Sequence, residues 1–309
     1  MLSVWSRVRW AVGRAVRDTR AGLAGTDTAL LSAGATLYGA LAAVPTLLVA
    51  VALAGVLFGR ERIAGLGGSL AVAIPDQQGA GSWVRALFSS GLSLSPLSVL
   101  FAVFMASAYG RGLSRALVRL VPTPHRAAPP PSLKARLLTL PLLGLAPLML
   151  LALLVITPTV ENLETENGLP GVVAASYLGL NLVWVILWAP LAWMFRVVAP
   201  GRPDWRAAWV AAVVTAAFVS GFLQGFTLFL ALPVDLGRPF GGLGLVGVTT
   251  ALLLWLWVLH AVVCVGYALT WALDGMFGAG HDQDDRDDRR TADDTGRVAA
   301  GPASPGGAG

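Results

Sequence analysis

Long stretches without charged side chains are the feature that most constrains this chain. Six apolar stretches contain almost no ionisable residue, and most arginines lie in alternate connections between them. Inside a lipid bilayer a segment must satisfy its own backbone hydrogen bonds, so an uncharged apolar stretch of about 20 residues is expected to form a spanning helix. The chain is also 56% hydrophobic and only 13% charged, which is too apolar for a typical soluble domain. The sequence therefore predicts an all-α polytopic membrane protein.

Composition and chain breakers divide the sequence into three parts. Residues 1–27 form a basic segment, residues 28–274 contain the spans, and residues 275–309 are rich in Asp and Arg and then in Gly, Pro and Ala, which favours disorder. The connection 59–90 favours short amphipathic pieces, and the connection after the third span holds three glutamates and no basic residue. The six spans are predicted at about 28–58, 91–109, 137–157, 172–195, 207–232 and 243–273.

The distribution of basic residues predicts the orientation. Arg and Lys are costly to move across a bilayer, so they gather in cytoplasmic connections. The N-terminal segment and the connections after the second and fourth spans hold fourteen of them, whereas the opposite connections hold four. We therefore expect a plasma (inner) membrane protein with both termini in the cytoplasm. The first span is too long for the apolar part of a cleavable signal peptide, and it is predicted to act as an uncleaved anchor.

The N-terminal segment is predicted to be a short amphipathic helix. Trp5, Val8, Val12 and Val16 share one helical face, and arginines lie largely opposite, which is typical of a helix at the headgroup level. A second set of arginines, spaced four residues apart, follows the second span. Because the net charge of +5 is spread over membrane-flanking segments, anionic lipid is favoured over nucleic acid as the partner. The predicted lipid-contacting residues are Arg7, Arg14, Arg17, Arg111, Arg115 and Arg119.

Three stretches resemble the YihY/BrkB family of inner-membrane proteins. The sequence SAGATLYGALAAVPTLL from Ser32 resembles that family's first span, in which small residues and an aromatic residue precede a proline and leucines. The sequence PDWRAA from Pro203 is similar to the basic entry into the fifth span. FGGLG from Phe240, followed by LLLWLW from Leu252, is similar to the Gly-rich entry into the sixth. The resemblance covers residues 32–272 and implies a six-helix membrane protein of poorly defined activity.

One departure from the family pattern concerns the end of the last span. Relatives usually have a Gly-Ala-Glu sequence there, whereas this chain has Gly266-Tyr267-Ala268. Because the glutamate is absent, any role that it has in relatives is not transferred to this chain.

Some members of that family carry a ribonuclease BN label, which can be tested on the residues. Metal-dependent RNA hydrolysis needs a cluster of His and Asp ligands. The three histidines, His125, His260 and His281, share no ligand spacing, and the Asp-rich run lies in the predicted disordered tail. There is also no Gly-x-Ser-x-Gly motif and no aspartate within a span, which argues against an intramembrane protease. We expect a non-enzymatic protein without a metal ion or cofactor.

Small residues on two spans predict sites of close helix packing. Ala35, Gly39 and Ala43 are spaced four apart on the first span, and Gly221 and Gly225 on the fifth. Such residues let helix backbones approach closely in lipid, where no hydrophobic effect drives association. Packing within the chain is the first interpretation, and a homo-oligomer contact is the second.

Prolines and polar residues within the spans have two interpretations: kinked helix packing alone, which the frequency of proline in membrane helices favours, or a cavity. A proline such as Pro45 removes a backbone hydrogen bond, and transporters use interrupted helices of this kind at substrate sites. His260 is the one strongly ionisable group deep in a span; it can bind a ligand or proton, or simply bond a neighbouring carbonyl. The predicted cavity-lining residues are Thr36, Tyr38, Pro45, Asn181, Gln224 and His260.

Two functions remain open at this point. The first is a permease or exporter of a small or amphiphilic solute, and the second is a membrane scaffold or lipid-interacting protein. A polar cavity that reaches His260 and Gln224 would favour transport, whereas a dry, closely packed bundle would favour the scaffold. The sequence names no substrate.

Overall fold

The computed structural model describes the backbone of residues 2–73, 79–125, 132–230 and 232–299. Side chains are described throughout this part except at 2–4, 73, 124, 132, 144–149, 151, 153–169, 172, 227, 230 and 279–299. All regular elements within the described backbone are helices. This confirms the predicted all-α fold.

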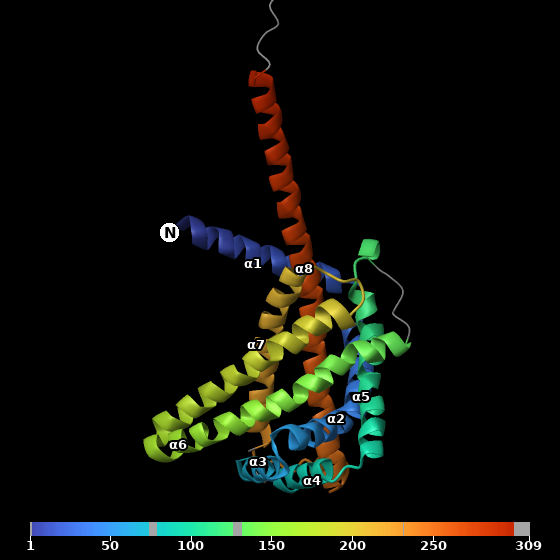
Figure 1. The fold of residues 1–309 in the computed structure, drawn as a ribbon, viewed down its shortest axis with the longest axis vertical. Helices are drawn as coiled ribbons and strands as arrows, with labels where there is room; N and C mark the ends of the chain where they lie inside the picture. The colour runs from blue at the N-terminus through green and yellow to red at the C-terminus, as the bar shows by residue number, and fades with distance from the viewer. Residues whose placement is uncertain (1, 74–78, 126–131, 231, 300–309) are drawn as a thin grey trace, which may run out of the picture.

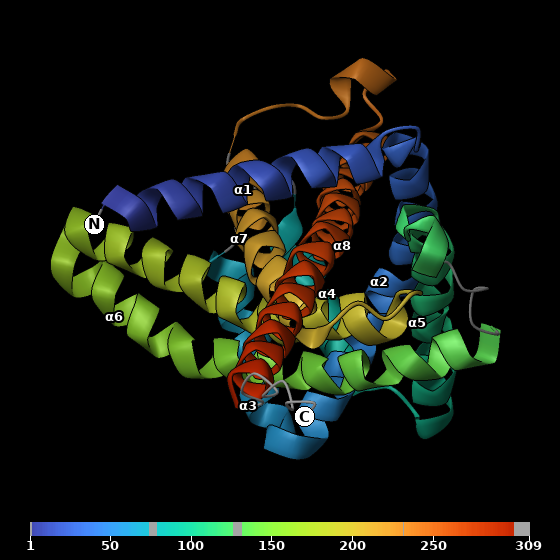
Figure 2. The ribbon, with the colours of Figure 1, turned by 90° about the horizontal axis from the view of Figure 1, so that it is seen from above.

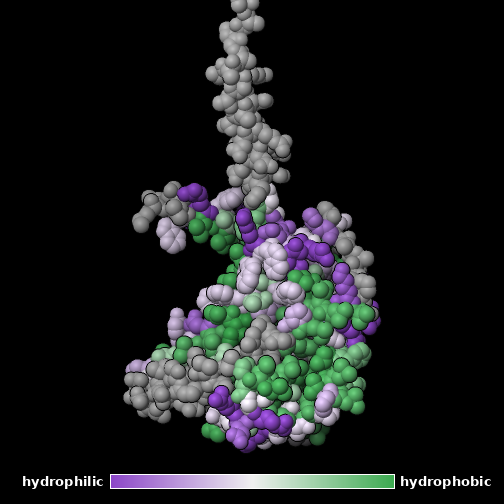
Figure 3. Space-filling model, viewed as in Figure 1, coloured by the Kyte–Doolittle hydropathy of each residue, from purple (hydrophilic) through white to green (hydrophobic). Residues whose placement is uncertain are grey.

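Five helices in the described part are long and apolar enough to cross a membrane, so the structure fits a membrane protein, and six spans is an approximate number. They are Thr28–Phe58, Pro96–Leu120, Val173–Val198, Trp205–Phe226 and Gly244–Gly278. Much of the predicted third span, 137–157, has side chains outside the described set. On the face seen in Figure 3, hydrophobic residues cover much of the middle of the bundle, and hydrophilic residues gather at its lower end and at its upper right, as expected for a protein in contact with lipid.

Helix α1 (Leu2–Leu23) projects sideways from the end of the bundle, across the direction of α8 (Figures 1 and 2). The side chain of Asp27 then caps α2 (Thr28–Phe58) by accepting a hydrogen bond from the backbone N–H of Leu30 at 2.9 Å. The predicted apolar face of α1 is largely uncovered: Trp5 is 74% exposed and Val16 is 46% exposed. An apolar face without a protein partner suits a helix that lies along a membrane surface.

Two short helices, α3 (Arg60–Ala73) and α4 (Ala80–Leu92), close the opposite end of the bundle (Figure 1). The guanidinium of Arg60 donates a hydrogen bond to the carbonyl of Leu92 at 2.5 Å, which joins the beginning of one to the end of the other. Apolar residues pack between them and α2, namely Val51, Ala54, Ile63, Leu66 and Phe88.

Helix α5 (Pro96–Leu117) begins later and ends later than the predicted span 91–109. Ser95 caps it by accepting a hydrogen bond from the N–H of Ser98 at 3.2 Å, and proline occupies the first turn, where its missing N–H costs nothing. Hydropathy does not register such a cap. The helix continues past the predicted end at 109 to Leu117, and Arg115 lies in its last turn, where a basic side chain is favourable.

Helix α6 (Ser132–Trp193) is helical throughout and turns back on itself, so that its two arms run side by side (Figures 1 and 2). The indole N–H of Trp193 donates to the carbonyl of Leu138 at 2.9 Å, whereas a straight helix would place these residues roughly 80 Å apart. The sequence instead predicts two spans, 137–157 and 172–195, joined by an acidic loop. The backbone stays helical there, and glutamate is a good helix former.

A five-residue π-helix, Met194–Val198, follows α6 and leads to α7 (Trp205–Leu230). After the short turn Arg238–Phe240, helix α8 runs from Gly244 to Ala299. The predicted disordered tail, 275–309, is thus helical in the structure as far as Ala299, and residues 300–309 lie outside the described part.

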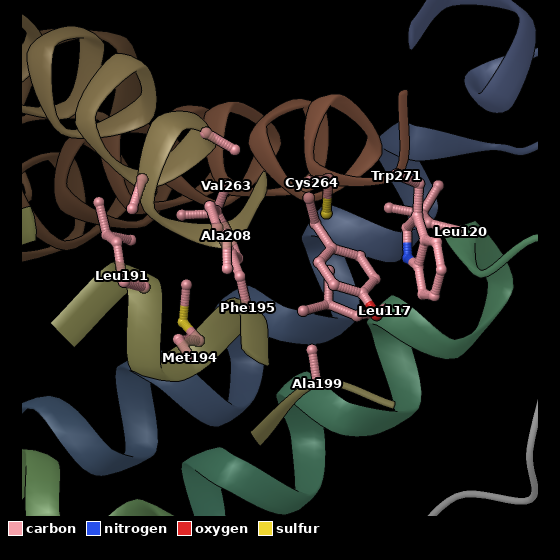
Figure 4. Close-up of a cluster of buried hydrophobic side chains, with 14 of the residues drawn as sticks. Leu117, Leu120, Leu191, Met194, Phe195, Ala199, Ala208, Val263, Cys264 and Trp271 are labelled. Atoms are coloured by element: carbon pink, nitrogen blue, oxygen red, sulfur yellow. The ribbon is translucent and has the colours of Figure 1, made fainter. Parts of the chain in front are cut away.

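The largest core lies where the C-terminal end of α5, the π-helix, α7 and α8 meet (Figure 4). Phe195 and Tyr267 are fully buried there, with ring centroids 5.9 Å apart. The N-terminal half of α7 contributes five fully buried alanines: Ala207, Ala208, Ala211, Ala212 and Ala216. These alanines let α7 approach its neighbours closely. Tyr267, within the Gly266-Tyr267-Ala268 stretch that departs from the family pattern, donates its hydroxyl to the carbonyl of Pro200.

Candidate functional site

His260 is the centre of the candidate site. It lies on α8 and is only 4% exposed, although it is the kind of side chain that is rarely placed inside a membrane helix. Helix α2 runs beside it and presents Thr36 and Gly39, while α5 presents Tyr109. Three helices that are distant in sequence therefore meet at one imidazole.

The hydrogen bonds around His260 define one neutral tautomer. Nδ1 lies 2.7 Å from the carbonyl oxygen of Leu256, which can only accept, so Nδ1 carries the proton. Nε2 then accepts from the hydroxyl of Tyr109 at 3.1 Å. Thr36 donates its own hydroxyl to the carbonyl of Ser32 at 2.7 Å and lies 3.3 Å from Nδ1, where it accepts a share of the same proton. Both ring nitrogens are satisfied within the protein.

Gly39 allows this imidazole to lie directly against α2. A Cβ atom at Gly39 would lie 2.7 Å from Cε1 of His260, closer than real contacts permit. Ala35, one turn earlier, is fully buried, whereas Ala43, one turn later, is exposed. The three small residues predicted on α2 therefore have different roles. Ala35 packs in the core, Gly39 contacts His260, and Ala43 lines the cavity described next.

A cavity of about 410 Å³ opens beside His260, among α2, α5, α6 and α8. Its surface is mainly apolar, and its polar side chains are Thr46, Tyr109, Thr139 and His260. The apolar lining residues are Gly39, Ala42, Ala43, Leu47, Ala106, Leu142, Leu143 and Leu256. Because Ala43 and Leu47 are exposed on the side of a spanning helix, the cavity opens sideways, towards the position of the lipid.

The structure brings together few of the predicted cavity residues. Of the six, His260 alone lines this cavity, and Thr36 contacts His260 from behind. Tyr38 packs instead against Gly112 of α5. Asn181 donates its amide to the carbonyl of Tyr177 on its own helix, at 2.8 Å.

The other two predicted residues also lie outside the cavity wall. Pro45 is half-buried inside α2, one residue before Thr46, and Gln224 is half-buried on α7, which contributes no residue to this wall. Gly221, on the same helix, is exposed with no atom within 4 Å of a Cβ built there, so the chain makes no close helix contact at this glycine within the described residues. A Cβ atom built at Gly225 would lie 3.7 Å from the ring of Trp255, which is an ordinary van der Waals contact.

Sequence reasoning missed Tyr109, Thr46 and Thr139. Tyr109 is the last residue of the predicted second span, two residues before Arg111, and a position at the end of a span does not indicate a place in its interior. The continuation of α5 to Leu117 instead places it beside His260. The signal that could have found it is the spacing of small residues on α5, where Ala102, Ala106 and Gly110 are buried and mark the face that meets other helices.

The site offers hydrogen bonds but no charge. The oxygen of Tyr109 donates its proton to His260 and keeps lone pairs that can accept from a hydroxyl, amine or amide. Among the wall residues that the structure describes there is no carboxylate and no arginine. Among the described residues, no group of three or more His, Cys, Asp or Glu side chains could hold a metal ion. The arrangement suits an uncharged polar group attached to an apolar body.

The predicted lipid-contacting arginines lie at one end of the bundle. Arg14 of α1 pairs with Asp18 at 3.5 Å and lies 5.4 Å from the ring centroid of Trp10. Arg14 and Arg119 of the segment after α5 line one hollow beneath α1. Arg7 and Arg17 are exposed on α1, Arg115 is exposed on α5, and Arg111 is half-buried there.

Comparison with known proteins agrees with the features described above. No curated protein and no solved structure was found to match the chain. A family model described as Virulence factor BrkB matches residues 21–291, which include every element from the end of α1 to the helical extension of α8. With an apolar helical bundle and a match over most of its length, this protein belongs to the BrkB family of membrane proteins.

Proposed function

We propose that this protein is a non-enzymatic permease or exporter of a small amphiphilic solute in the plasma membrane. The observation that carries the proposal is the mainly apolar cavity beside His260, which opens sideways and ends on a hydrogen-bonding pair. A solute could enter with its apolar part from the lipid and place its polar group at Tyr109. A scaffold protein would have no need of such an opening in its bundle.

The charge of the solute follows from the cavity wall. The described residues of the wall carry no charge, so an ionised group would lose its hydration there with no counter-ion in return, which is costly in a low-dielectric environment. Hydroxyls, amides and neutral amines lose less, and the Tyr109 oxygen can replace one of their water contacts. The proposed substrate class is therefore an uncharged amphiphile.

The alternative function, a lipid-interacting or scaffold protein, is supported by α1. Its exposed Trp5 and Val8 and its arginines suit attachment to anionic headgroups. The two functions are compatible, because α1 lines no part of the His260 cavity. The permease function, however, is the one of the two that uses the cavity inside the bundle.

Proteoliposomes test the proposal, with a fluorescent monoacylglycerol as the probe. Ala43→Phe would fill the cavity mouth, whereas Ala217→Phe adds the same side chain to an exposed alanine of α7 outside this cavity. We expect the first variant to lower transbilayer movement about tenfold, equivalent to 1.4 kcal/mol, and the second to leave it unchanged. Equal rates in both variants, or no protein-dependent movement of the probe, would contradict the permease proposal.

We further propose that both termini face the cytoplasm. The arginines of α1 and of the end of α5 lie at one end of the bundle, and Arg60, Arg62 and Arg85 lie on α3 and α4 at the other. The larger basic cluster belongs on the cytoplasmic side. Reporter fusions at Asn162 and at Arg126 should report opposite sides of the membrane, with Arg126 inside.

A further inference from the structure

A second hollow lies on the outside of the bundle, where α1 crosses α7 and α8. It has a volume of about 490 Å³ and an almost entirely apolar surface. Four residues of α1 contribute to it at positions 16, 19, 20 and 23, which share one helical face. The remaining wall comes from α7 and α8: Val214, Thr215, Phe218, Trp257, Val258, Ala261, Val262, Val265, Gly266 and Leu269.

The polar side chains in this groove, apart from one, already have partners within the protein. Thr19 donates to the carbonyl of Ala15 and Thr215 to that of Ala211, each at 2.7 Å. The indole of Trp257 donates to the carbonyl of Ala29 at 3.0 Å. These three groups therefore have no free hydrogen-bond donor for an occupant, and the contacts that the wall offers are mainly apolar.

Arg20 is the exception. It lines the groove and is exposed, and its guanidinium makes no hydrogen bond or ion pair with any residue that the structure describes. The nearby carboxylate of Asp18 is engaged by Arg14. An apolar groove with one guanidinium that lacks a described partner complements a molecule with an apolar body and an anionic head.

We propose that this α1 groove binds an acyl chain of an anionic phospholipid, with the phosphate at Arg20. The groove lies on the surface of two spanning helices, so it is continuous with the lipid, and α1 has the amphipathic pattern of a helix at the headgroup level. A second copy of the chain would cover the apolar wall equally well, but it would leave Arg20 without a counter-charge. Arg20 extends the set of arginines that the sequence assigned to lipid contact.

This site is separate from the proposed solute cavity. The two share α8, but His260 and Leu256 face the cavity, whereas Trp257, Val258 and Ala261 face the groove. A bound phospholipid would attach α1 to the bundle without entering the path of the solute. The lipid proposal can therefore fail while the permease proposal holds, and the reverse.

Native mass spectrometry of the full chain, delipidated in detergent, tests the proposal with two probes, dioleoyl phosphatidylglycerol and dioleoyl phosphatidylcholine. We expect one tightly retained phosphatidylglycerol and weaker retention of phosphatidylcholine. Arg20→Gln should reduce phosphatidylglycerol binding about fivefold, to the level of phosphatidylcholine, as expected for one basic residue at a lipid surface. Arg85→Gln, which removes the same charge from exposed α4 at the opposite end, should change nothing.

A second pair of variants tests the groove itself. Ala261→Phe fills it and should abolish retention of both lipids, and Ala217→Phe on the exposed side of α7 serves as its control. Equal binding of the two lipids by the wild type would overturn the proposal, as would loss of binding in Arg85→Gln to the same extent as in Arg20→Gln. A wild-type dimer that Ala261→Phe converts to monomer, with no lipid retained, would assign the groove to a second copy instead.

Discussion

One face of α8 passes through two very different environments. Cys264, Tyr267 and Trp271 lie in the main core and are closely surrounded, whereas His260, one turn before Cys264 on the same face, borders an open cavity. The difference comes from the neighbouring helices. Around Tyr267 the buried alanines of α7 bring two helices together, whereas beside His260 the small residues of α2 and α5 line a cavity.

This contrast shows how a helical bundle in lipid can be stable and still contain a cavity. Lipid is as apolar as the core, so helices gain little from hydrophobic burial and depend on close packing and hydrogen bonds. The main core uses packing. The His260 level uses a short hydrogen-bond chain instead, from Tyr109 through the imidazole to the carbonyl of Leu256. Loss of packing in the main core and loss of a hydrogen bond at His260 should therefore lower the free energy of unfolding by unequal amounts.

The largest effect is expected for Phe195→Ala. Phe195 is fully buried in the main core, so its removal leaves a cavity and should lower the free energy of unfolding by about 3 kcal/mol. Thermal unfolding in detergent measures the change. Phe101→Ala on α5 is the control, since that side chain is 66% exposed, and it should be nearly neutral. Equal losses in the two variants would remove the distinction between core and surface.

An intermediate effect is expected from added volume. Ala212→Leu places a larger side chain where Ala212 is fully buried, and overpacking of this kind should destabilise by about 2 kcal/mol. Ala43→Leu adds the same atoms at the mouth of the His260 cavity, where there is room, and should cost almost nothing. If Ala43→Leu were the more damaging of the two, the cavity would not be open in the folded protein.

The smallest effect is expected for Tyr109→Phe. This change removes the hydroxyl that donates to Nε2 of His260 and should cost about 1 kcal/mol, the usual net value of one hydrogen bond. Tyr177→Phe, at an exposed tyrosine of α6, is the matched control. Chemical denaturation of both variants checks the difference, and a loss well above that of Phe195→Ala would show that the His260 level, not the main core, dominates stability.

The sequence predicted the helical membrane fold because uncharged apolar stretches leave few alternatives in lipid. It was less informative wherever local helix signals competed with hydropathy. The glutamates between the two arms of α6 were interpreted as a loop, although they favour helix, and Ser95 and Pro96 fix the beginning of α5 more firmly than apolarity does.

The candidate site was harder to predict, because hydropathy does not fix the rotation of a helix about its axis. His260 was found through its rarity within a span. Gln224 and Asn181 were chosen for polarity alone, yet Asn181 bonds its own helix and neither residue lines the cavity. Tyr109 was missed because its partner lies 151 residues away in the chain.

The bend of α6 has a consequence for how the chain enters the membrane. The hydrogen bond from Trp193 to the carbonyl of Leu138 joins the two arms near their open ends. Residues 158–171, between the arms, contain no Lys or Arg, and acidic residues do little to hinder translocation. We therefore expect the two arms to insert together as one hairpin during biosynthesis, before α7 is synthesised.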